Sequence, residues 1–114
     1  MSAVLLKERL RADLKAAMQA KAADQVRLLR TLIAALDNAE AVPRADTPYV
    51  PRRFGEAGGE VPRLELGDAA IADILDAEAD SRLAAATDYE RHGEAEQAAR
   101  LRDEAALIAR YRPA

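Results

Sequence analysis

Glu78 and Arg82 are the polar residues with the clearest capacity for chemistry, because they interrupt an apolar helical line. The line begins with Ile71 and Leu75, and the two charged residues follow four apart, in the order that favours a helical ion pair. Charged groups in such a line predict a partly buried network that fixes how helices pack, with a ligand site as the alternative. We assign seven residues to this candidate polar network: Arg30, Asn38, Glu40, Glu78, Arg82, Tyr89 and Glu104.

Two further groups have residue types used in functional sites. Asp73, Asp76 and Asp80 form a stripe at helical spacing, and a solvated helix face accounts for it, because a calcium-loop pattern and a Glu-x-x-His pair are both missing. His92 is the single histidine and follows a predicted helix end, where a cation interacts favourably with the helix dipole. No hydroxyl residue stands in a nucleophile elbow. We therefore predict no catalytic residue, no metal ligand and no cofactor.

The cluster Arg52, Arg53 and Phe54 is the best local candidate for a nucleic-acid contact. Arginine charge beside an aromatic face is typical of proteins that bind single-stranded nucleic acid. Acidic residues surround the cluster, so a solvated loop without a nucleic-acid role is the competing interpretation.

The composition indicates the elements that must position these residues. The chain has 114 residues, enough for one core, and 28 of them are alanine while only four are aromatic. Alanine leads the helix scale and is depleted in strands, so we predict an all-α fold. The lack of cysteine excludes disulfides, thiolate zinc sites and thiol nucleophiles, and a net charge of −3 argues against binding nucleic acid by overall charge.

Proline and glycine divide the chain into two helical hairpins. Four of the five prolines and four of the five glycines lie between residues 43 and 67, which predicts a long Pro/Gly-rich loop there. This loop is long for a compact domain, and we expect it to be partly disordered or ordered by a partner. The helices are expected in an antiparallel four-helix arrangement, at about 2–20, 23–41, 68–91 and 94–111.

Capping residues and apolar spacing define the expected helix ends and faces. Ser2 and Asp68 are the expected N-caps of the first and third helices, and Gly93 is expected to end the third in a left-handed conformation. The second helix has the widest apolar face and is expected to be the most buried. The buried stripe of the first helix is expected to contain Leu6, Leu10, Leu14, Ala17 and Met18.

Residues 1–114 are expected to form a single helical domain. The N-terminal residues lack a signal-peptide pattern, and no apolar run approaches the ~20 residues that a membrane span needs. We therefore expect a cytoplasmic protein without membrane contact.

Three stretches of the sequence carry a family resemblance. Their order and spacing resemble the YqeY-like (GatB/YqeY) family of small bacterial proteins, which is related to the tail of the GatB subunit of the aspartyl/glutamyl-tRNA amidotransferase. Together they cover nearly the whole chain outside the loop. The first comprises Leu10, Leu14, Ala16, Ala17, Met18, Ala20 and Lys21; the second Leu29, Arg30, Leu32, Ala35, Asn38 and Glu40; the third Glu78, Arg82, Tyr89, Gly93, Ala98, Glu104, Tyr111 and Pro113.

The resemblance implies the N-terminal helical part of a YqeY-like protein. Members of that family continue past a closing Tyr-Leu-Pro into a three-helix subdomain, whereas this chain has Tyr111-Arg112-Pro113 and ends with the next residue. We therefore expect the three-helix subdomain to be absent. The resemblance also implies a link to carbon–nitrogen ligases that use glutamine as the nitrogen donor. The chain has no phosphate-cradling glycine loop and no activated nucleophile for that chemistry.

The favoured interpretation is a non-catalytic helical accessory module that binds tRNA or a protein of the tRNA-linked machinery. A structural protein–protein interaction module is the alternative, in the form of an oligomer such as a homodimer through an exposed face of the Ala-rich hairpin. An amidotransferase enzyme is the third possibility. Binding of tRNA, a dimer mass and glutamine-dependent product formation separate the three.

Overall fold

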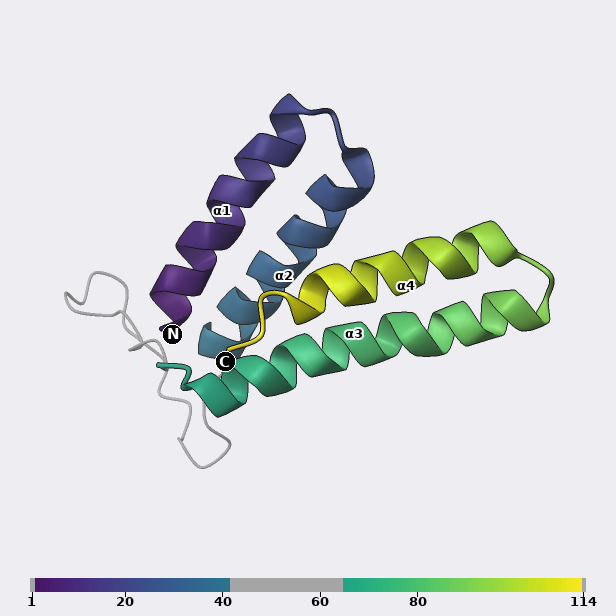
Figure 1. Ribbon diagram of the computed structural model, residues 1–114. Coiled ribbons are helices and arrows are strands. Elements are labelled where there is room, and N and C mark those ends of the chain that lie inside the picture. The colour runs from purple at the N-terminus through teal and green to yellow at the C-terminus, as the bar shows by residue number, and fades with distance from the viewer. Residues whose placement is uncertain (1, 42–64, 114) are drawn as a thin grey trace, which may run out of the picture.

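The computed structural model describes residues 2–41 and 65–113, and these residues form four α-helices (Figure 1). The helices are α1 (Ala3–Gln19), α2 (Ala23–Ala41), α3 (Asp68–Arg91) and α4 (Ala95–Ala109). No strand occurs in the described residues, so the all-helical prediction is confirmed for them. Most of the predicted 43–67 loop, including Arg52, Arg53 and Phe54, lies outside the described residues. None of the helices in these ranges combines the length and the apolar character needed to cross a membrane.

Helices α1 and α2 pack side by side as the N-terminal hairpin. The Oγ of Ser2 accepts a hydrogen bond of 3.2 Å from the amide of Leu5, so Ser2 is the N-cap that the sequence predicts. Met18 was expected on the buried stripe of α1, but it is 51% exposed. The inward position belongs to Ala17, which is 4% exposed, and the next residue points about 100° away around the helix.

Helices α3 and α4 pack side by side as the C-terminal hairpin. Gly93 in its turn has φ +78°, the left-handed conformation that was predicted there. The prediction that Asp68 is the N-cap of α3 is wrong. Asp68 is the first residue of the helix, and Gly67 takes the cap position without a side-chain hydrogen bond. Helix α4 ends at Ala109 instead of 111, which leaves Tyr111 in the chain beyond the helix.

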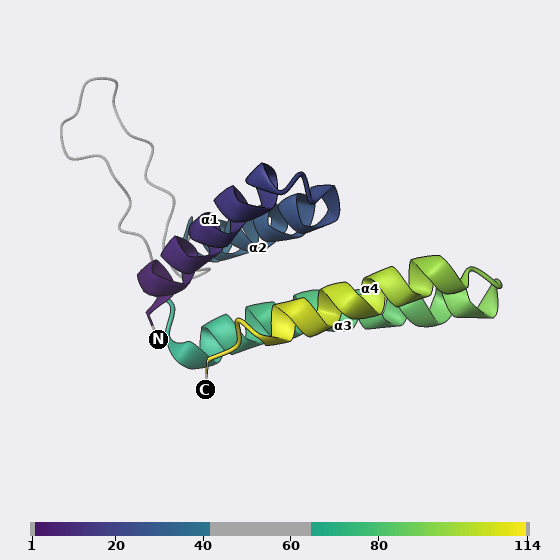
Figure 2. The ribbon, with the colours of Figure 1, turned by 45° about the horizontal axis from the view of Figure 1, so that its top comes forward.

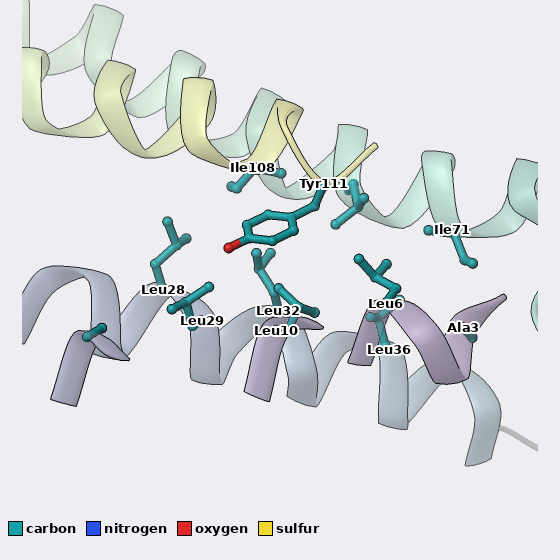
Figure 3. Close-up of a cluster of buried hydrophobic side chains, with 12 residues drawn as sticks. Ala3, Leu6, Leu10, Leu28, Leu29, Leu32, Leu36, Ile71, Ile108 and Tyr111 are labelled. Carbon is teal, nitrogen blue, oxygen red and sulfur yellow. The ribbon is translucent and has the colours of Figure 1, made fainter. Parts of the chain in front are cut away.

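The two hairpins meet at their bases around a leucine-rich core (Figure 3). Leu32 and Leu36 of α2 have no exposed surface, and α1 contributes Leu6 and Leu10, which are equally buried. Toward their turns the hairpins diverge, as Figures 1 and 2 show from two sides. The C-terminal hairpin contributes four residues to this shared core: Ile71, Leu75, Ile108 and Tyr111.

Candidate functional site

Three members of the predicted polar network come together between α3 and α4. The Nη1 of Arg82 donates hydrogen bonds of 2.9 Å to the main-chain carbonyl and to Oε2 of Glu78, one helical turn earlier. Its Nε lies 3.4 Å from Oε2 of Glu104 on α4. The three side chains are 17% to 29% exposed, so the cluster lies at the edge of the helix pair. Arg82 therefore links the two helices of the C-terminal hairpin.

The other four members of the predicted network lie elsewhere. Glu40 was expected as a partner of Arg82, but the structure pairs it with Lys7 instead. Glu40 is 7% exposed and lies near the end of α2. The shared core of the hairpins lies near their bases, with one further contact between Asp24 at the start of α2 and Arg100 of α4. Arg82 lies further along α3, where α4 is its neighbour. The remaining three members are exposed residues, namely Arg30, Asn38 and Tyr89.

A buried cation in the N-terminal hairpin is the main polar feature that sequence reasoning missed. Lys7 is 7% exposed, and its Nζ donates to Glu40 at 2.9 Å and to Asp37 at 3.1 Å. The hydrogen bond to Glu40, helped by Asp37 and opposed by burial, raises the pKa of Lys7 above its usual 10.5. Lys7 is therefore charged at neutral pH and links α1 to α2, and it is not a nucleophile.

The positions of Lys7 and Glu40 relative to the apolar residues of their helices could have predicted this ion cluster from the sequence. Lys7 adjoins Leu6 on the buried side of α1, and Glu40 stands four residues after Leu36 on the buried side of α2. Opposite charges on two facing apolar stripes indicate a buried pair, because neither is stable there without the other.

Tyr111 joins the chain end to α1. Its side chain lies between the two hairpins (Figure 3) and is 3% exposed. Its hydroxyl donates a hydrogen bond to Oδ2 of Asp13. The guanidinium of Arg9 lies 4.7 Å from the centre of the ring, within cation–π range. Burial, together with the hydrogen bond to Asp13, raises the pKa of Tyr111 to about 12. The phenol thus stays neutral and acts as a donor.

Comparison of the chain with protein-family models, curated proteins and solved structures gave no match.

His92 and Asp76 of the aspartate stripe on α3 contact nearby groups of the fold. The Nδ1 of His92 lies 2.7 Å from the main-chain carbonyl of Asp88 at the C-cap of α3, where the ring is exposed. Asp76 pairs with Arg112 at 3.1 Å, which ties the residues after α4 to α3. Within the described ranges no group of three His, Cys, Asp or Glu residues is arranged to hold a metal ion.

The exposed charges are divided unequally between the two hairpins. Residues 2–41 contain seven Lys or Arg and five Asp or Glu, whereas residues 65–113 contain six and twelve. Besides Arg9, which lies over the ring of Tyr111, the N-terminal hairpin has four exposed cations that form no ion pair with any described residue: Arg11, Lys15, Lys21 and Arg30. Arg11 and Lys15 stand four residues apart and share one face of α1. The sequence's net charge of −3 conceals this local positive surface.

Proposed function

We propose that the protein is a non-catalytic helical binding module of the YqeY-like type, which binds tRNA through its N-terminal hairpin. It would act in the cytoplasm as an accessory to tRNA-linked metabolism, in the neighbourhood of glutamine-dependent carbon–nitrogen ligases. The resemblance supports the link to tRNA. The observation that carries the proposal is the surplus of exposed cations on the N-terminal hairpin that pair with no described residue.

Exposed cations of this kind suit a polyanionic partner. Each Lys or Arg that meets a phosphate releases a condensed counterion, so affinity falls log-linearly with salt. Four such contacts, from Arg11, Lys15, Lys21 and Arg30, give a slope of about −3. The C-terminal hairpin, with twelve acidic and six basic residues, repels the same partner and favours one orientation of binding.

The buried and partly buried polar side chains already form ion pairs or hydrogen bonds within the fold, which supports a binding role rather than a catalytic one. Lys7 is held by two carboxylates, Arg82 by Glu78 and Glu104, and the phenol of Tyr111 by Asp13. Each of these groups connects two elements of the fold, which is a packing role.

Anisotropy of labelled bulk tRNA, titrated with the protein across a salt series, tests the proposal. The double variant Arg11→Gln/Lys15→Gln is expected to weaken binding and to make the salt slope shallower by about 1.5. The matched control Arg91→Gln/Arg102→Gln removes the same charge from exposed positions of the C-terminal hairpin and is expected to leave the slope unchanged. Failure of the wild-type protein to bind at low salt, or equal weakening in both variants, contradicts the proposal.

A structural protein–protein interaction module is the second candidate. The half-exposed Leu83 (44%) and Tyr89 (39%) on the Ala-rich C-terminal hairpin favour it. Two copies that met through this hairpin would bring its acidic surplus together, so a homodimer there should be weakened at low salt. Sedimentation equilibrium at low and high salt tests this: a dimer mass without tRNA binding would replace the first candidate by the second.

A further inference from the structure

A cavity of about 430 Å³ lies beside Tyr111, at the junction of the two hairpins. Side chains of α1, of the first half of α2 and of the last turn of α4 line it. Its volume is in the range of small-ligand pockets. The cavity is distinct from the exposed cations proposed to meet tRNA.

Two guanidinium groups and one carboxylate line this cavity, and the carboxylate is already engaged. Arg9 lies over the ring of Tyr111, and Arg110 is the C-cap residue of α4. Both cations are near enough to Tyr111 to act on its pKa, in the direction opposite to Asp13. Asp13 accepts a hydrogen bond from the phenol of Tyr111, whereas neither arginine forms an ion pair with a described carboxylate. The cavity therefore has positive charge left for an anion.

Apart from Tyr111 and the polar side chain of Gln25, the rest of the lining is aliphatic. Ala16 and Ala20 of α1 border the cavity, with Leu29 of α2 and Leu107 of α4 across from them. A nucleobase would not gain the usual stacking energy here, because the ring of Tyr111 is 3% exposed and Arg9 lies over its face. A flexible aliphatic group fits this lining better than a planar aromatic one.

We propose that this cavity binds the carboxylate of an aliphatic chain, with Arg9 and Arg110 holding the oxygens and the alanine and leucine side chains covering the carbon chain. Guanidinium groups suit carboxylates because their N–H groups match two oxygens at once. The same chemistry is offered by a free short-chain carboxylic acid and by the C-terminus of a polypeptide that ends in an aliphatic residue.

Titration of the isotope-labelled protein with hexanoate and with the peptide acetyl-Gly-Gly-Leu, each beside its carboxamide, tests the proposal. The methyl resonances of Ala16 and Ala20 are expected to shift with the two carboxylates and not with the two amides. Stronger binding of the peptide would identify a polypeptide C-terminus as the source, and stronger binding of hexanoate a free acid.

The variant Arg110→Gln is expected to weaken carboxylate binding at least tenfold. Arg110 is exposed, so the substitution should not disturb the fold, and Arg91→Gln at the far end of the C-terminal hairpin is the matched control. Absence of methyl shifts with both carboxylates, equal shifts with the amides, or unchanged affinity in Arg110→Gln would overturn the proposal. None of these outcomes depends on tRNA binding.

Discussion

The N-terminal and C-terminal hairpins are both pairs of helices, but different side chains hold them together. The N-terminal hairpin has a core of fully buried leucines and an ion cluster in which Lys7 and Glu40 are each 7% exposed. In the C-terminal hairpin, buried alanines such as Ala86 and Ala98 line the contact, and the polar link through Arg82 stays at its edge. A polar link is therefore costly to break where a wide apolar core covers it, and inexpensive to break where small residues leave it near water.

The hairpins also differ in charge. Basic residues exceed acidic ones in residues 2–41, and acidic residues are twice as numerous as basic ones in residues 65–113. This difference separates a surface suited to phosphates from one that repels them. Four substitutions probe the difference in packing, and their expected effects decrease in the order given.

The largest effect is expected for Lys7→Met. It removes the buried cation that links Glu40 and the 40%-exposed Asp37 of α2 to α1, so the free energy of unfolding should fall by about 3 kcal/mol. Urea unfolding followed by far-UV circular dichroism measures it. Lys15→Met, on the exposed face of the same helix, should change stability by no more than about 0.5 kcal/mol. Equal effects of the two substitutions would contradict the buried ion cluster.

Tyr111→Phe comes next, because it removes a donor from the charged Asp13. We expect a loss of about 1.5–3 kcal/mol at neutral pH, with Tyr89→Phe as a nearly neutral control. The folded-state pKa of about 12 lies above the usual 10.0, so this contribution is complete below pH 10 and is lost as the pH rises toward 12. The stability difference between wild type and variant should therefore shrink over that interval. A constant difference would contradict the buried phenol.

Ala86→Leu tests the alanine seam, by which we mean the buried alanines Ala86 and Ala98 between α3 and α4. Ala86 has no exposed surface, and a larger side chain must push α3 from α4, at a cost of about 1–3 kcal/mol. Ala84→Leu, at an exposed position of α3, is the control and should be nearly neutral. Thermal unfolding of both variants gives the comparison, and a stabilised Ala86→Leu protein would show that the seam has spare room.

The smallest effect is expected for Arg82→Met. Its partners Glu78 and Glu104 are partly exposed, so the loss should be no more than about 1 kcal/mol, well below that of Lys7→Met. Chemical unfolding beside the exposed control Arg91→Met measures it. Unchanged or increased stability with intact helical content would mean that Arg82 is not needed for packing, and a ligand role would gain support.

The helices were predictable because their signals are local. Alanine content, apolar spacing and the concentration of proline and glycine between 43 and 67 depend only on neighbouring residues. Gly93 took the left-handed turn conformation that its position after a long helix indicates. The contact between Arg82 and Glu104 was also within reach, because antiparallel helices joined by a short turn place such residues opposite each other.

The links between distant segments were not predictable in the same way. Tyr111 finds its acceptor 98 residues away, and the pairing depends on where α4 ends relative to α1. Glu40 was grouped with the wrong cation, because the divergence of the hairpins decides which helix it reaches. Lysine is a residue type that usually lies on the surface, and only the position of Lys7 next to Leu6 indicates that it is buried.

Mapping the residues that contact tRNA by NMR is the most direct test of the proposal that the N-terminal hairpin binds tRNA. Unlabelled bulk tRNA is added to isotope-labelled protein, and amide resonances are followed at low salt and again at high salt. We predict salt-reversible shifts at Arg11, Lys15, Lys21 and Arg30, with the resonances of α3 and α4 largely unmoved. Shifts concentrated in α3 and α4, or none at all at low salt, would contradict the proposal.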